Sequence, residues 1–186
     1  MKILFLPNWT VNYLNVDKKE LQAPDKYIKG QRYWFFKYFP QDTNVDIIDI
    51  HKNNILHGLE KKLKFYIYQA FLAYRVMRKY DIVISHGAQS GIVLALLRLI
   101  FGKGNTIHLI FDIGGMNGGK TQGFSTKLIQ LAMKSNPYII GHSSVIKDNI
   151  KQTYPWLTDR TKIILFGVGL DQYVIHENRF LANLGG

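Results

Sequence analysis

Three polar side chains in this sequence follow short apolar runs and carry groups that catalysis uses. They are Asn8, His86 and Asp112. An imidazole or a carboxylate can take a proton from a hydroxyl group, and an amide can hold that group by hydrogen bonds. If the apolar runs are parallel strands, the three side chains lie outside the carboxyl ends of those strands, where open α/β sheets bind their ligands. The sequence therefore predicts a ligand site at one edge of a sheet.

The elements that position these side chains are six apolar or β-branched runs with amphipathic segments between them. The predicted strands are Lys2–Pro7, Val45–Ile50, Asp81–Ser85, Thr106–Phe111, Tyr138–Gly141 and Lys162–Phe166. The predicted helices are Tyr27–Tyr38, Leu59–Tyr80, Gln89–Phe101, Ser125–Lys134 and Ser144–Tyr154. Strands with few polar interruptions are typical of a sheet buried on both faces, and their alternation with helices favours right-handed crossovers. We predict an α/β domain with a mostly parallel sheet.

Composition narrows the possible partners. The chain has 186 residues, 47% of them hydrophobic, which suits one domain with its own core. It has no cysteine, which excludes disulfides and thiolate metal sites. Lys and Arg outnumber Asp and Glu by 24 to 13, and this excess favours an anionic partner such as anionic lipid or a phosphorylated substrate. We expect no nucleic acid, because no nucleic-acid module is recognisable and the charge is spread along the chain. No His and carboxylate cluster has the spacing of metal ligands, so no metal is expected.

Two segments of the chain bear on membrane association. The run Met1–Pro7 lacks the basic lead and cleavage site of a signal peptide, and no stretch reaches the roughly 18 apolar residues of a membrane span. These features predict a cytoplasmic protein. One face of the predicted helix Leu59–Tyr80 mixes basic and aromatic residues, namely Lys61, Phe65, Tyr68, Leu72, Arg75 and Lys79. This face suits peripheral contact with the anionic inner surface of a membrane, or is an ordinary solvated face.

Four segments carry a resemblance to a known family. They are Tyr80–Ser90, Ile110–Gly114, Ile140–Ser144 and Leu165–Asp171. By their order and spacing, the chain resembles the acceptor-side domain of GT-B fold glycosyltransferases, in particular family 4. The resemblance implies that residues 1–171 form a Rossmann-like three-layer α/β/α N-terminal domain, one half of a GT-B fold. Residues 172–186 would then be a linker and the first strand of a missing C-terminal donor domain.

The resemblance also implies an activity. The family transfers a sugar from a nucleotide-sugar donor to an acceptor hydroxyl, so the full-length protein is expected to be a glycosyltransferase of the hexosyltransferase type. The acceptor would be a saccharide or a lipid-linked molecule, and the nucleotide sugar is a co-substrate, so no cofactor is implied. Because the donor binds mostly to the second domain, this chain alone is expected to be inactive.

By the same resemblance, Asp112 and His86 are the catalytic residues and orient the acceptor hydroxyl or stabilise charge on the sugar. Phe111 stands where many members have the histidine of a His-Asp pair, so one of these two residues replaces it, or the mechanism does not need it. Trp9 and Tyr13 would stack on a sugar or plug the edge of the domain. The expected substrate-binding residues are Asn8, Trp9, Tyr13, Gly87, Gln89, Ser90, Gly114, Gly115, Lys120, Ser143 and Gly167.

The segment Gly114–Thr121 leaves a second hypothesis open. It matches the pattern G-x-x-x-x-G-K-[ST], in which main-chain N–H groups and the lysine hold phosphates. Against this hypothesis, the next helix is predicted to start only at Ser125, the preceding strand is the fourth, and no later strand ends in an acidic residue. The alternative function is a P-loop-like phosphate- or nucleotide-binding module. Otherwise Lys120 would contact the diphosphate of a donor or a phosphorylated acceptor.

Overall fold

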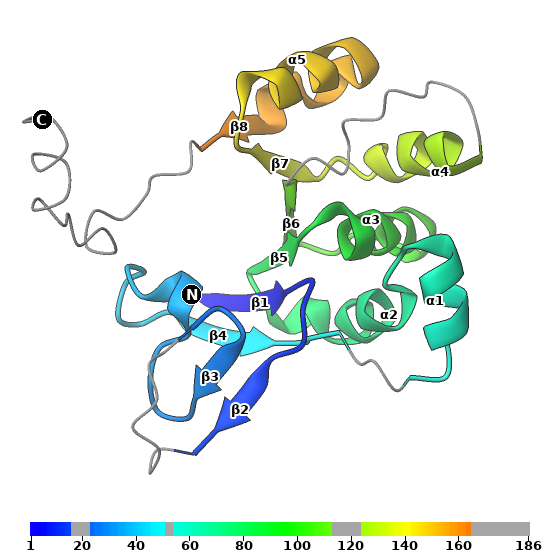
Figure 1. Ribbon diagram of the computed structural model, residues 1–186. Helices are drawn as coiled ribbons and strands as arrows, with labels where there is room; N and C mark the ends of the chain where they lie inside the picture. Colours follow the sequence, from blue (N-terminus) through cyan, green and yellow to red (C-terminus); the bar gives the residue numbers. More distant parts are fainter. Residues whose placement is uncertain (16–22, 51–53, 113–123, 165–186) are drawn as a thin grey trace, which may run out of the picture.

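The centre of the molecule is a sheet of six parallel strands in the order β4-β1-β5-β6-β7-β8 (Figure 1). The computed structural model describes residues 1–15, 23–50, 54–112 and 124–164 of the chain. The strands of this sheet are β1 (Lys2–Leu6), β4 (Asn44–Ile47), β5 (Ile82–His86), β6 (Ile107–Asp112), β7 (Tyr138–Gly141) and β8 (Thr161–Ile163). All six predicted strands are therefore present, and the predicted α/β class with a parallel sheet is confirmed.

Strand β1 is buried on both faces, as its unbroken apolar run predicts. Leu4 and Leu6 pack in the core cluster that α2 and α3 complete. Ile3 and Phe5 point to the opposite face and pack against Tyr33. Alternate residues of one strand thus hold two separate layers on the sheet.

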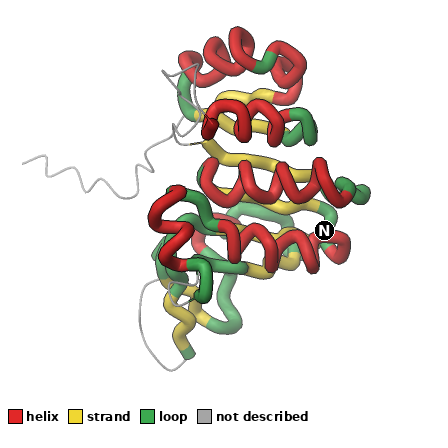
Figure 2. The backbone as a smooth tube through the Cα atoms, turned by 90° about the vertical axis from the view of Figure 1, so that its right-hand side faces the viewer, coloured by secondary structure: helices red, strands yellow, loops and turns green. Residues whose placement is uncertain are grey.

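Helices cover one face of the sheet from end to end, and Figure 2 shows them stacked along it. The helices are α1 (His57–Leu63), α2 (Ile67–Val76), α3 (Ala88–Phe101), α4 (Phe124–Met133) and α5 (Ser144–Thr153), with short 3₁₀ helices η2 (Met77–Lys79) and η3 (Pro155–Arg160). In α5 the buried side chains are Ile146 and Ile150, four residues apart on one side of the helix. This spacing explains how a largely polar helix packs on the sheet.

The opposite face of β1 and β4 is covered by the segment between them. It contains the 3₁₀ helix η1 (Trp34–Phe36) and a two-stranded parallel sheet of β2 (Asn12–Leu14) and β3 (Lys26–Ile28). Tyr33 and Phe36 pack on β1 and supply the third layer of the Rossmann-like fold. The helix predicted over Tyr27–Tyr38 is wrong: Gly30 has a φ of 86° and Tyr33 is extended, so no helix passes through them.

The single helix predicted over Leu59–Tyr80 is also wrong, because the chain breaks at Lys64. This residue ends α1 in the left-handed conformation with a φ of 59°. The Glu60 carboxylate accepts the main-chain N–H of Tyr68 at 2.7 Å, which caps the first turn of α2. As a result, the basic and aromatic face predicted for this segment is not continuous, and Phe65 packs on the core. No helix in the described part of the chain is long and apolar enough to cross a membrane.

The strand order reverses beside β1. From β1 the chain passes to β4 on one side, and it then returns to β5 on the other side and continues outward to β8. Such a reversal leaves a crevice outside the carboxyl ends of the two central strands, since the connections on either side lead away from it. The exits of β1 and β5 are therefore the place to look for a ligand site.

Candidate functional site

Two side-chain amides meet at a glycine between these exits. Gly87 joins β5 to α3 with a φ of 113° and a ψ of 150°, a conformation that favours glycine. A Cβ atom at Gly87 would lie 3.2 Å from Nδ2 of Asn8 and 3.3 Å from Oε1 of Gln89. The absence of a side chain therefore lets both amides approach this turn. Because Asn8 follows β1 and Gln89 lies in the first turn of α3, the amides bridge the reversal point.

His86 ends β5 among aromatic rings on the side of the sheet away from α2 and α3. Its ring centroid lies 4.7 Å from that of Trp9 and 5.4 Å from that of Phe35, and it stacks on Phe111 at 5.2 Å. Burial lowers the pKa of His86 to about 4, while its own main-chain carbonyl opposes the shift. Within the described residues its buried Nδ1 atom has no hydrogen-bond partner. The imidazole is therefore neutral near pH 7, able to hydrogen-bond a hydroxyl group but weak as a base.

A pocket of about 360 Å³ opens beside Gln89. Its walls are formed by Ile50, His57, Glu60, Lys61, Lys64, Tyr66 and Gln89. The Glu60 carboxylate already accepts the side-chain amide of Asn54 at 2.8 Å as well as the main-chain N–H that caps α2. Burial, and then the Glu60 charge, raise the pKa of Tyr66. Two lysines beside one engaged carboxylate make the pocket suitable for an anionic group. Sequence reasoning missed this pocket because it placed Lys61 on an outer helix face, either in contact with a membrane or solvated.

Two further buried polar residues fix the exits of β1 and β4. The Gln69 amide donates to the main-chain oxygens of Pro7 at 2.8 Å and Ile48 at 2.6 Å. The Asp49 carboxylate accepts the main-chain N–H of Val11 at 2.8 Å. Sequence reasoning missed both residues, since Asp49 fell inside a predicted strand. The signal for Gln69 was a polar residue among the apolar positions that α2 turns toward the sheet.

The two aromatic residues predicted to bind substrate have different settings. Trp9 donates its indole N–H to the main-chain oxygen of Pro24 at 2.8 Å and stacks on Phe35 at a centroid distance of 5.4 Å. Trp9 thus plugs the edge of the domain and forms a wall of the His86 site. Tyr13 lies on β2 with 59% of its surface exposed and its ring 5.8 Å from that of Tyr27. Burial, and then the Asp49 charge, raise the pKa of Tyr13.

The two predicted serines both stand at the starts of helices at this edge. Ser90 lies in the first turn of α3, and among the described residues its buried hydroxyl has no hydrogen-bond partner. Ser143 precedes α5 in an extended conformation and makes no side-chain cap hydrogen bond. The sheet order separates Ser143 from β5 by β6, so it does not belong to the Asn8 and His86 group.

The remaining predicted residues fall wholly or partly outside the described part of the chain. Asp112 is the last residue of β6, so its backbone reaches the carboxyl edge beside β5, but its side chain is not described. Gly114, Gly115, Lys120 and Gly167 lie outside the described residues. The possible P-loop is therefore a prediction that the geometry leaves untested.

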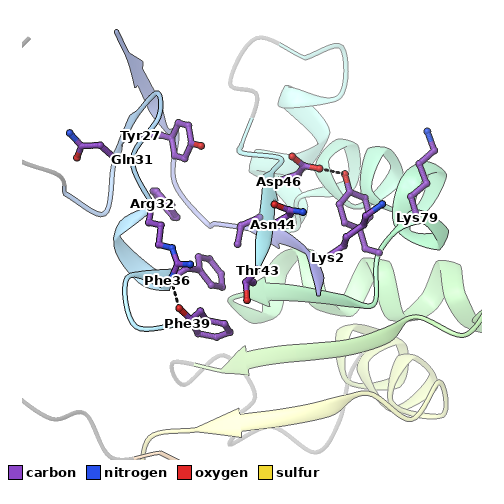
Figure 3. Close-up of a pocket in the computed structure, with 13 residues that line it drawn as sticks. Lys2, Tyr27, Gln31, Arg32, Phe36, Phe39, Thr43, Asn44, Asp46 and Lys79 are labelled. Carbon is purple, nitrogen blue, oxygen red and sulfur yellow. Dashed lines mark hydrogen bonds between the residues drawn. The ribbon is translucent and has the colours of Figure 1, made fainter. Parts of the chain in front are cut away.

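Another pocket lies at the other edge of the sheet, where β1 and β4 begin (Figure 3). It has a volume of about 540 Å³, and hydrogen bonds within the protein engage some of its polar side chains. Tyr80 donates its hydroxyl to the carboxylate of Asp46 at 2.7 Å, and burial raises the pKa of Tyr80 to about 12. Arg32 donates to the main-chain oxygens of Phe39 and Pro40. We place the candidate site at the carboxyl edge, where the strand order reverses, although the pocket there has a smaller volume.

The described residues contain no group of three or more His, Asp or Glu side chains that could hold a metal ion. No model of a protein family matches the chain, and no protein of curated function is significantly similar to it in sequence.

Proposed function

We propose that this chain is the acceptor-binding domain of a glycosyltransferase that uses a nucleotide-sugar donor. The observation that carries the proposal is the pair of amides of Asn8 and Gln89 at the turn that follows His86, where the strand order reverses. These are three hydrogen-bonding side chains, and the imidazole is uncharged near pH 7. Uncharged hydrogen-bonding groups beside aromatic walls suit the hydroxyl groups and apolar faces of a sugar. The order of motifs that resembles GT-B enzymes supports the same function.

The adjoining basic pocket gives the proposal a place for phosphate. Lys61 and Lys64 line it, and Gln89 belongs to both the pocket and the amide pair. A phosphate of a donor diphosphate or of a phosphorylated acceptor would then lie next to the hydroxyl-binding side chains. The net positive charge of the chain would favour the approach of either molecule.

In the proposed reaction, the acceptor oxygen bonds to the anomeric carbon while the bond from that carbon to the diphosphate breaks. The hydroxyl proton must leave to a base. His86 would accept a hydrogen bond from the hydroxyl and orient it, but a pKa of about 4 makes its imidazole a weak base. We therefore assign the proton to Asp112, which ends the neighbouring strand.

Ligand-observed NMR with a panel of saccharides tests acceptor binding by this chain. We expect one or more saccharides to bind, and Asn8→Ala or Gln89→Ala to weaken binding about fivefold or more through a lost hydrogen bond. Gln31→Ala, on the pocket at the opposite edge, is the matched control and should bind as the wild type does. The absence of saccharide binding, or equal loss in the control, would contradict the proposal. Release of nucleoside diphosphate by the full-length gene product then tests transfer itself.

A further inference from the structure

A third pocket, of about 270 Å³, lies where β6 and β7 begin, at the edge of the sheet opposite the candidate site. The C-terminal half of α3, the loop after it, the turn after α4 and the end of η3 form its walls. Three of its lining residues are basic, namely Arg98, Lys103 and Arg160. Among the residues that the structure describes, no aspartate or glutamate lines it. The pocket therefore concentrates positive charge.

Arg98 is a buried cation without an acidic partner in the described part of the chain. Only 6% of the residue is exposed, and its guanidinium donates to the main-chain oxygen of Thr106 at 2.7 Å and to the sulfur of Met77 at 3.5 Å. Its Nε atom has no hydrogen-bond partner there. Burial lowers the pKa of Arg98, which reflects the cost of holding this charge away from water. Buried charges are normally paired, so an anion in the pocket would stabilise this guanidinium.

Two more buried polar atoms on the same pocket lack partners within the described residues. They are Nδ1 of His108 and the hydroxyl of Ser135, on residues that are 2% and 3% exposed. Nε2 of His108 lies 3.1 Å from the hydroxyl of Ser85. Burial, and then the Arg98 charge, lower the pKa of His108 to about 3, so its ring is neutral. If Ser85 donates to Nε2, the single ring proton sits on Nδ1 and can be donated to a ligand.

The outer wall adds two cations. Lys103 lies in the loop between Gly102 and Gly104, which both have positive φ. Arg160 donates to the main-chain oxygen of Asn136 at 3.2 Å and lies 4.8 Å over the ring of Tyr138, so its guanidinium is held at the pocket. Donors on α3, β6, the α4–β7 turn and η3 therefore approach one space from different directions.

We propose that this pocket binds a phosphate group, either free or as the monoester of a small molecule. A tetrahedral oxyanion accepts hydrogen bonds on several sides and neutralises more than one cation, which matches the donors that line this pocket. The same anion pairs the buried guanidinium and satisfies the Ser135 hydroxyl. This site is separate from the proposed acceptor site, because it lies at the opposite ends of the strands.

Isothermal titration calorimetry with inorganic phosphate and with glycerol phosphate, at ionic strength held constant by chloride, tests the proposal. We expect binding of at least one of them, and the tighter of the two identifies the source. Ser135→Ala removes a hydroxyl that has no described protein partner, and Lys103→Ala removes an exposed cation. Each should weaken binding about fivefold or more while leaving the fold intact.

Lys147→Ala is the matched control, since it removes an exposed lysine of α5 that lines neither this pocket nor the one at the carboxyl edge. Wild-type affinity in this variant supports the inference. The inference is overturned if neither ligand binds beyond the chloride control, or if Ser135→Ala and Lys103→Ala bind as the wild type does. A loss confined to a third variant, Lys61→Ala in the pocket at the carboxyl edge, would also overturn it, because the phosphate would then occupy that pocket.

Discussion

Acid should destabilise this protein through His86, and the replacement His86→Phe should remove that effect. The pKa of His86 is about 4 in the folded protein, against an ordinary value of 6.5. Between these values the unfolded chain binds nearly one more proton than the folded one, so stability falls as the pH falls. The part of the free energy of unfolding that depends on a neutral His86 is fully present above about pH 6.5 and is lost as the pH drops toward 4.

The size of this effect follows from the same two values. Because of buried His86, the free energy of unfolding falls by about 2 kcal/mol from pH 7 to pH 5. The fall reaches on the order of 3 kcal/mol once the pH is below the pKa of His86 in the folded protein. His108 acts with the same sign on the other face of the sheet, because burial lowers its pKa to about 3. The wild type alone therefore does not isolate His86, and the variant is needed. A phenyl ring has no titrating group and suits the surrounding rings of Phe5, Trp9 and Phe111.

Urea unfolding of both proteins at pH 7 and pH 5 measures the difference. His86→Phe should lose about 2 kcal/mol less than the wild type on going from pH 7 to pH 5. Gln31→Ala, which removes an exposed side chain without a titrating group, is the control and should keep the wild-type pH dependence. If His86→Phe and the wild type lose the same free energy, the imidazole is not held neutral by burial. The reasoning for its role as an uncharged hydrogen-bonding group would then fail.

Three other changes have outcomes that the fold or the sequence predicts. Gly141→Ala should lower the free energy of unfolding in urea by about 1–3 kcal/mol, because the added Cβ atom would lie 2.8 Å from Cγ2 of Ile146. Gly58→Ala, whose Cβ atom would have no neighbour within 4 Å, should be neutral or slightly stabilising, and equal effects of the two changes would contradict the tight packing of β7 on α5. Glu60→Ala should cost about 1–3 kcal/mol, because it leaves the capped main-chain N–H of α2 without its acceptor, and an unchanged unfolding midpoint would refute that cap. Lys120→Ala should abolish nucleotide binding, measured by calorimetry, if the glycine-rich loop is a P-loop, and should affect a glycosyltransferase only modestly.

The fold was largely predictable because its central strands are apolar on both faces. The run at β1 can be recognised from the sequence alone, since consecutive residues such as Leu4 and Phe5, which face opposite sides of the sheet, are both buried. The predictions that failed depended on long-range contacts. Tyr33 and Phe36 are spaced as on a helix, but they pack on β1 from a segment with a positive φ at Gly30. Likewise, only the folded chain brings the Glu60 carboxylate to α2 and makes two helices from one apolar pattern.

The site shows the same division between topology and side-chain contacts. The reversal of strand order makes the exits of β1 and β5 the favoured edge, so Asn8 and His86 could be selected from their positions after apolar runs. The chemical properties of these two side chains could not be predicted, because they depend on neighbours that are distant in sequence. Burial among the nearby rings makes His86 a neutral group, and the amino-acid composition gives no sign of this burial. The anion site proposed at the opposite edge could not be predicted from the sequence for the same reason. In the sequence, Arg98 is one of 24 lysines and arginines, and only its burial without an acidic partner in the described residues points to an anion site.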